Sequence, residues 1–228
     1  MEAPGHVRHS MVRGRAGVRA GGLYKTGDGN VPVGGPAAGP ADTPLDLDSR
    51  SAAIRVDAPV GPASLSLRAS TWEEDRGSGL LNTRANASGH SLSATAARAP
   101  VGDSYGWRLQ AWRIESNFAN TSASVNADRS YTTPANDQYR PARARWGLNA
   151  ALRRGSGDVA GGRLEWELGA DARFNEGQTN EHYSYVSGEF RRERFAGGET
   201  SVVGGYVGGS WTQGPRLVAG GGRLVGWQ

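Results

Sequence analysis

In the stretch GRLEWELGADARF, from Gly162 to Phe174, apolar residues alternate with mostly charged residues. One set of alternate positions is apolar: Leu164, Trp166, Leu168, Ala170, Ala172 and Phe174. The other set is mostly charged: Arg163, Glu165, Glu167, Asp171 and Arg173. Successive side chains of a β-strand point to opposite faces, so the stretch predicts a strand with one apolar and one charged face. Either a soluble sandwich, with the apolar face in its core, or a membrane barrel, with that face in lipid, would use such a strand.

The same alternation recurs along the chain, and helical patterns are scarce. It is found in residues 51–57, 64–70, 91–96, 107–111 and 145–153. Two Gly-rich segments, residues 200–212 and 216–227, extend the series although their phase is unclear. Together these segments predict an all-β protein of about eight strands.

The connections between these strands are alternately short and long. The short connections are Ala58–Ala63, Ala99–Ser104, Arg154–Gly161 and Gln213–Pro215. The long, polar connections are Glu73–Ser88, Asn117–Ala144 and Asn175–Gly198. In an antiparallel up-and-down meander, alternate connections lie at the same end of the sheet, so one end has short turns and the other long loops. Transmembrane β-barrels have this asymmetry, and the pattern therefore favours part of such a barrel.

Composition excludes several other classes of protein. The chain of 228 residues has no cysteine, which excludes a disulfide scaffold and cysteine metal sites. No run of about 18 apolar residues is present, so a transmembrane helix is excluded as well. The net charge of +4 raises the question of nucleic acid, but Lys25 is the only lysine and the arginines alternate with acidic residues instead of forming a patch. We therefore expect no nucleic-acid partner.

Several stretches, taken in order, resemble the barrel of TonB-dependent outer-membrane receptors. LSLRASTWEEDRGSGLLNTRANAS (residues 65–88) is similar to a strand, an EDRGNG-type loop and a returning strand of that family. ASVNADRSYTTPANDQY (residues 123–139), LGADARFNEGQTNEHY (residues 168–183) and RRERFAGGE (residues 191–199) follow at matching spacing. The resemblance covers the chain from about Tyr24 to Phe195.

The resemblance implies a nutrient receptor of the outer membrane, with an iron–siderophore chelate as an example of the small ligand. Its partners would be outer-membrane lipid and, for the full-length parent only, the TonB energy-transducing complex. We expect residues 1–20 to be a disordered N-terminus without a signal peptide, and residues 21–228 to be a partial barrel. The plug domain and the remaining strands of such a receptor are absent, and the chain ends on Gln228 instead of an aromatic residue. The sequence is thus interpreted as an internal barrel fragment.

No pattern in the sequence points to an enzyme, a cofactor or a metal centre. There is no phosphate-binding loop of the Walker type and no G-x-S-x-G turn. His6, His9, His90 and His182 lack the spacing of metal ligands to one another. Two acidic groups are interpreted as solvated loop charge, namely Asp42, Asp46 and Asp48, and Glu73, Glu74 and Asp75.

Two sets of residues are candidates for function in such a barrel. The resemblance implies that inward-pointing charges hydrate the lumen and contact the plug. This lumenal set is Arg55, Arg68, Arg145, Arg163, Glu165, Glu167, Asp171 and Arg173. Tyrosines in the long outward loops are candidates for contact with the ligand. These are Tyr131, Tyr139, Tyr183 and Tyr185.

Two alternatives to the receptor fragment remain open at this point. One is a complete small outer-membrane barrel with a structural or adhesive role, because eight strands suffice to close a barrel. The other is a soluble extracellular β-domain, which predicts an apolar core between two sheets. A fragment predicts an open, curved sheet with unpaired edges instead, since closure would require residues 216–227 to pair with residues 51–56.

Overall fold

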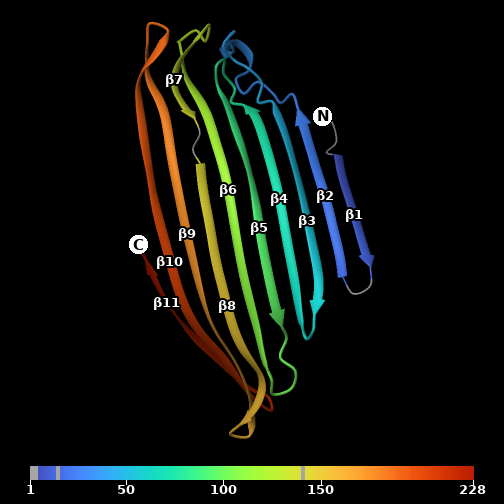
Figure 1. The fold of residues 1–228 in the computed structure, drawn as a ribbon. Coiled ribbons are helices and arrows are strands. Elements are labelled where there is room, and N and C mark those ends of the chain that lie inside the picture. The colour runs from blue at the N-terminus through green and yellow to red at the C-terminus, as the bar shows by residue number, and fades with distance from the viewer. Residues whose placement is uncertain (1–4, 14–15, 140–141) are drawn as a thin grey trace.

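The computed structural model describes residues 5–13, 16–139 and 142–228, which form a single curved antiparallel sheet (Figure 1). The strands are β1 (Gly5–Arg13), β2 (Ala16–Gly27), β3 (Leu47–Val60), β4 (Ala63–Gly77), β5 (Arg84–Arg98), β6 (Tyr105–Val125), β7 (Thr132–Tyr139), β8 (Ala142–Val159), β9 (Gly162–Val186), β10 (Glu189–Gln213) and β11 (Arg216–Trp227). A short 3-10 helix, η1 (Gly35–Ala37), lies between β2 and β3. Within the described ranges, no helix is long and apolar enough to cross a membrane.

The strands follow one another across the sheet in chain order, which confirms the predicted meander. β7 and β8 both pair with β6 and with β9, so they lie end to end in one position of the sheet (Figure 1). Among the described residues, β1 pairs only with β2 and β11 only with β10, so the sheet is open at both edges. This arrangement confirms the open sheet that a fragment predicts, and the eight predicted strands correspond to β3–β6 and β8–β11.

The N-terminal part of the chain departs from its predicted disorder. Residues expected to be unstructured up to position 20 contribute to β1 and β2, and β2 pairs with β3 from Gly17 to Gly27. Gly17, Gly21 and Gly22 interrupt the side-chain alternation of β2, which hid this strand from a search for periodicity. Backbone hydrogen bonds to β3 do not require side chains, and the pairing therefore forms in spite of the weak pattern.

The connections predicted as long loops are mostly extended strand, which corrects the sequence interpretation. β9 and β10 run on as a hairpin and are joined by Ser187 and Gly188 alone, both of which have positive φ. β7 lies within the connection predicted for residues 117–144, and the link between β4 and β5 shortens to residues 78–83. A strand that has water on both faces needs no apolar alternation, so periodicity does not reveal it.

The two faces of the sheet differ sharply in the middle of the strands. Cross-strand register places Leu148, Ala172 and Val203 side by side on one face, and Asn149 beside Asp171 on the other. Asp171 is only 7% exposed, whereas Leu148 is 52% exposed. Side chains crowd together on a concave surface and spread apart on a convex one. The polar face is therefore the concave inner face, and the apolar face is the convex outer face.

Large rings lie over glycines on the inner face. A Cβ atom at Gly147 would come within 2.7 Å of the Trp112 ring, and one at Gly169 within 2.5 Å of the Tyr206 ring. Trp72 covers Gly89 in the same way. Glycine in a strand marks such close approach, and each ring covers backbone that glycine leaves bare.

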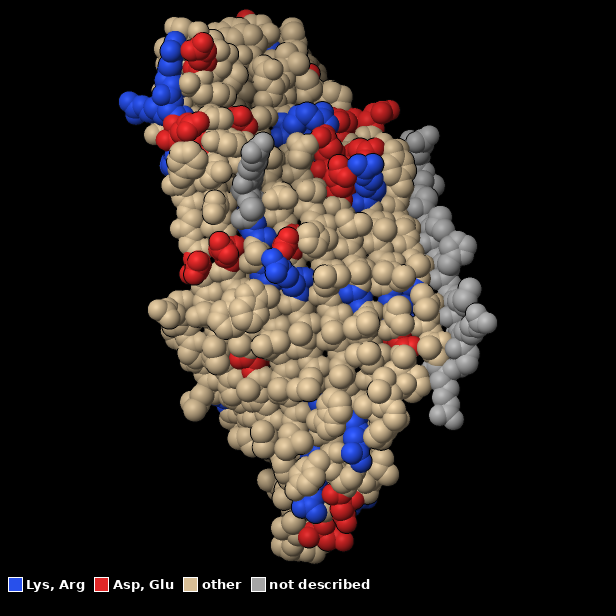
Figure 2. Space-filling model, viewed as in Figure 1, with Lys and Arg blue, Asp and Glu red and all other residues tan. Residues whose placement is uncertain are grey.

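An apolar core is almost lacking. Among the described residues, only Ala41 and Ala85 are buried and hydrophobic. The large aliphatic side chains of the outer face stay exposed, and Figure 2 shows charged side chains gathered toward the ends of the strands with a broad, mainly uncharged band between them. A soluble domain with a core between two sheets is therefore contradicted, because the described residues form one sheet with no second layer.

Candidate functional site

A row of polar side chains crosses the inner face at one level of the sheet. Each member lies directly opposite the next on the neighbouring strand. The row consists of Asp57, Ser66, Thr95, Gln110, Asn149 and Asp171. Two residues further along each strand, a parallel row on the same face includes Arg55, Arg68 and Arg173. Because side chains alternate between the two faces of a strand, the register joins polar residues of separate strands into one continuous polar surface.

All eight residues predicted to be lumenal share this inner face. The register brings Arg55 directly opposite Arg68, while Arg163, Glu165, Glu167, Asp171 and Arg173 follow one another along β9. Arg145 occupies the matching side of β8, opposite Asn175. The register places these positions on one face, and their lumenal role and contact with a plug remain predictions.

Three carboxylates of the inner face have partners, and several of its arginines do not pair with a carboxylate. The Arg223 guanidinium donates to Asp171 at 2.6 Å, and the Tyr206 hydroxyl donates to Glu167 at 2.7 Å. Asp57 accepts from Arg55 at 2.9 Å and from Arg19 at 3.0 Å. Among the described residues no carboxylate pairs with the arginines Arg68, Arg145 and Arg173. The inner face therefore carries excess positive charge.

Arg223 and Tyr206 are inner-face residues that the sequence analysis did not single out. Both lie in the Gly-rich strands β10 and β11, where many positions lack a side chain and the alternation has no clear phase. The register pairs Tyr206 with Arg223, and Gly204 leaves space for the Arg223 guanidinium to reach Asp171. Only the pairing of β9, β10 and β11 brings these groups together.

Three of the four candidate ligand-contact tyrosines lie in the part of β7, β9 and β10 that projects beyond the paired length of β8. Tyr139 stacks on His182 with ring centroids 4.2 Å apart, and the Arg194 guanidinium lies 5.4 Å from the Tyr183 ring. Tyr185 meets Phe190 edge to face. The fourth, Tyr131, is 59% exposed in the turn before β7. The structure thus groups three of the four in one extension.

His182 links the three strands of this extension. One ring nitrogen lies 2.9 Å from Glu193 on β10, and the other lies 3.5 Å from Asp137 on β7. Glu181, on the opposite side of β9, accepts two hydrogen bonds from Arg194. His90 likewise lies 3.3 Å from Glu115. Both histidines thus contact carboxylates, and among the described residues no three His, Asp or Glu side chains gather as a metal site.

Three connections interlock at the same end of the sheet. The Ala41 amide donates to the Arg129 carbonyl at 2.9 Å, and the Leu81 amide donates to the Ala41 carbonyl at 2.9 Å. The Arg129 guanidinium donates to both carboxylate oxygens of Asp42, through its Nε at 3.0 and 2.9 Å. Residues 28–46, 78–83 and 126–131 therefore form one cap, which we call the interlocked loops.

Asp42 is the acidic centre of the interlocked loops, and its side chain is 1% exposed. The hydrogen bonds from Arg129 and from the Gly39 amide lower the pKa of the Asp42 carboxyl to about 2. Asp46 pairs with Arg84, and Asp48 accepts from Tyr24. Folding brings a partner from another segment to each of these aspartates. The interpretation as solvated loop charge is wrong for Asp42, which is buried, whereas the Asp46 and Asp48 side chains remain partly exposed to solvent.

The other acidic group predicted to be loop charge lies in β4. Glu73 accepts from Arg50 at 2.7 and 3.0 Å, and Asp75 pairs with Arg84. Glu74 lies 3.7 Å from the Arg76 guanidinium. Glu73 and Asp75 thus link β4 to β3 and to β5 at the loop end, whereas the Glu74–Arg76 pair lies within β4.

Comparison with known proteins gives a likeness in structure alone. No protein-family model matches the chain, and no curated protein matches its sequence. Among solved structures, the chain is similar to FpvA of Pseudomonas aeruginosa bound to heterologous pyoverdines, with a TM-score of 0.78 and 10% sequence identity over 98% of this chain. It is also similar to the siderophore receptor PiuA from Acinetobacter baumannii, with a TM-score of 0.66 and 8% identity over 98% of the chain.

A further similar structure is that of the RagAB peptide transporter, with a TM-score of 0.64 and 9% identity over 98% of this chain. The chain spans 35% of the length of the FpvA chain, 40% of PiuA and 32% of the RagAB chain. At this level of identity the likeness establishes the fold. The chain has the fold of a section of the barrel wall of outer-membrane receptors, as the resemblance to TonB-dependent receptors implied.

Proposed function

We propose that this chain forms part of the barrel wall of a TonB-dependent outer-membrane receptor for uptake of a nutrient, such as an iron–siderophore chelate. The observation that carries the proposal is the open sheet whose exposed apolar face opposes a charged face. An exposed apolar band needs lipid, and a spanning sheet needs every backbone group paired. Both unpaired edges then meet further strands of the receptor, for which about 22 strands are typical.

Each surface has a defined role in this proposal. The outer face contacts the lipid of the outer membrane, and the short turns lie at the periplasmic end. The inner face hydrates the lumen and contacts the plug through its unpaired arginines. The tyrosines of the β7, β9 and β10 extension face the outside and contact the small nutrient ligand. The TonB complex engages the full-length receptor and not this section.

Detection in membranes tests the proposal. Antibodies against this chain should reveal an outer-membrane protein about three times larger than its 24.0 kDa, because the chain covers 35% of the FpvA length. Deleting the corresponding gene should abolish uptake of one iron chelate during growth on limiting iron. A 24.0 kDa outer-membrane band that migrates faster before boiling would instead show the complete small barrel with a structural or adhesive role.

A further inference from the structure

We propose that the outer face binds the phosphate of an anionic phospholipid at its short-turn end, through two arginines set among aromatic rings. The residues are Arg98, Tyr105, Trp107, Arg154 and Trp166, which we call the turn-end patch. They come from β5, β6, β8 and β9, which are interior strands of the sheet. The inference rests on the part of the proposed function that places the outer face in lipid.

The turn-end patch lies on the same face as the apolar band. Arg98 and Leu152 lie on either side of Trp107, each directly opposite it in the register. Leu152 in turn lies opposite Leu168, and Arg154 follows it by two residues, so it points to the same side. Both arginines are half-buried. Their apolar stems can therefore cover neighbouring rings while the guanidinium groups stay at the surface.

Aromatic rings surround Arg154. It lies directly opposite Tyr105 on β6 and Trp166 on β9, and its guanidinium is 5.7 Å from the centroid of the Tyr105 ring. The Tyr105 and Trp166 rings meet edge to face with centroids 6.0 Å apart. Within the part of the chain that the structure describes, the Arg154 Nε has no hydrogen-bond partner although it is shielded from solvent. An unsatisfied donor of this kind is costly, so the position favours a ligand that supplies an acceptor.

The arginines at the two limits of the apolar band differ in their pairing. Near the loop end of the outer face, Arg113 pairs with Glu115 and Arg50 pairs with Glu73. Among the described residues no carboxylate pairs with either arginine of the turn-end patch. The short-turn end therefore carries uncompensated positive charge beside apolar surface. Guanidinium groups match the oxygens of a phosphate with two parallel hydrogen bonds, which makes a phosphate the complementary ligand.

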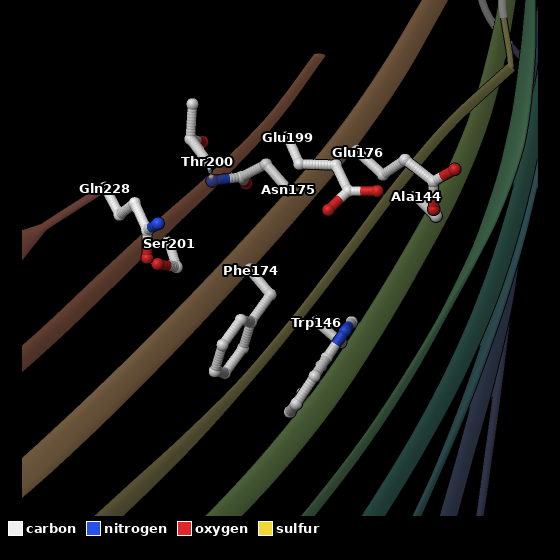
Figure 3. Close-up of a pocket in the computed structure, with 9 residues that line it drawn as sticks. All are labelled: Ala144, Trp146, Phe174, Asn175, Glu176, Glu199, Thr200, Ser201 and Gln228. Atoms are coloured by element: carbon white, nitrogen blue, oxygen red, sulfur yellow. Dashed lines mark hydrogen bonds between the residues drawn. The ribbon is translucent and has the colours of Figure 1, made fainter.

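The position of the turn-end patch selects a lipid as the source of that phosphate. On β9, Trp166 and Phe174 are eight residue steps apart, about 27 Å along the strand, close to the roughly 25 Å height of an apolar barrel band. Phe174 stacks on Trp146 at the other limit, with ring centroids 4.1 Å apart (Figure 3). Arg154 is level with Trp166, where headgroups begin. The two arginines are two strands and two residues apart, about 12 Å between Cα atoms, so both side chains can reach one headgroup whose acyl chains lie along the band.

Tryptophan fluorescence of the full chain in non-ionic maltoside micelles tests the turn-end patch. The probe is phosphatidylglycerol with brominated acyl chains, which quench nearby tryptophans, and phosphatidylcholine with the same chains is the matched lipid of zero net charge. Phosphatidylglycerol should bind more tightly, and Arg98→Gln or Arg154→Gln should each weaken its binding about fivefold. Tyr105→Leu should weaken it about threefold through the lost ring face. Arg153→Gln, which removes the same charge one residue away on the inner face, is the control and should leave the preference unchanged.

The possible failures separate the patch from the proposed function. Quenching by neither lipid would show that the outer face does not meet lipid, which contradicts both. Quenching by both lipids with equal affinity, or equal losses for Arg154→Gln and Arg153→Gln, would overturn the turn-end patch alone. Sodium phosphate that abolishes the preference, where sodium chloride of the same ionic strength does not, would show a site for free phosphate instead. Circular dichroism of each variant checks that the strands are retained.

Discussion

The middle of the sheet and the end with the interlocked loops are stabilised in different ways. In the middle, one face is apolar and exposed, the other is polar, and the strands are held by their backbone ladder and by rings placed over glycines. At the loop end both faces are polar, and ion pairs such as Asp42–Arg129 and Glu181–Arg194 join distant segments. The proposed function accounts for this difference, because it places the middle in lipid and the loop end in water. Substitutions in the middle should therefore change membrane assembly or global stability, and substitutions at the loop end should change local amide exchange.

The largest effect, on membrane assembly, is expected for a charged residue placed on the outer face in the middle of the strands. Leu168→Arg in the full-length parent should reduce membrane assembly, because a basic residue facing lipid near the bilayer midplane costs about 2–4 kcal/mol. The fraction that migrates as a folded, heat-modifiable band after refolding into vesicles measures this loss.

The matched control is Glu165→Arg, three residues away along β9 and on the inner face. Its side chain is exposed and faces the wet side, so assembly should be close to that of the unmodified protein. Equal losses for both substitutions would contradict the assignment of the apolar face to lipid.

A smaller effect is expected from filling the space of an inner-face glycine. In Gly147→Ala the new methyl group would lie 2.7 Å from the Trp112 ring and 2.9 Å from the Ala172 carbonyl oxygen. Overpacking of this kind costs about 1–3 kcal/mol, which urea unfolding in micelles would measure. Gly222→Ala is the control, since a Cβ atom there meets no atom within 4 Å. A loss no greater than that of the control would show that the ring moves aside freely.

At the loop end, breaking the Asp42–Arg129 pair should loosen the cap and leave the middle intact. In Arg129→Ala the buried carboxylate of Asp42 loses its guanidinium donor, so amide hydrogen exchange of residues 39–46 should accelerate. Exchange in β4, β5 and β6 should stay unchanged. Faster exchange across the whole sheet would instead mean that the cap and the middle unfold together.

The same pair predicts how the cap responds to acid. The folded-state pKa of Asp42 lies below its ordinary value of 3.8, at about 2, so its contribution is complete above pH 3.8 and is lost as the pH falls through about 2. Exchange of the residue 39–46 amides, corrected for intrinsic pH dependence, should therefore rise only in that range. A rise near neutral pH would point to another group.

The smallest effect is expected at His182 in the extension. His182→Phe keeps an aromatic ring against Tyr139 and removes the contacts to Glu193 and Asp137. Exposed pairs of this kind contribute roughly 0.2–1 kcal/mol, so thermal unfolding should shift by only a few degrees. His182→Ala, which also removes the stacked ring, should cost more. If His182→Phe were as destabilising as His182→Ala, the carboxylate contacts would outweigh the stack.

The sequence by itself determined the strands whose environment differs on their two faces. β9 was evident from Gly162 to Phe174 because an apolar and a polar environment select opposite residue types at alternate positions. The same alternation predicted that the charged residues from Arg55 to Arg173 share one face. The alternating connection lengths predicted the meander, and the interpretation as a fragment predicted its open edges. These features are local or periodic, so each can be read from one segment at a time.

Only the tertiary structure decided what depends on pairing between distant segments. Glycines interrupt the side-chain alternation of β2, and the ends of β9 and β10 are polar on both faces, so these sequences carry no clear period and pairing with the partner strand makes them strands. The Asp42–Arg129 pair and the stacked rings of Trp146 and Phe174 require a register between separate parts of the chain. A shift of one residue in that register would move every side chain to the other face, and nothing within either segment alone specifies it.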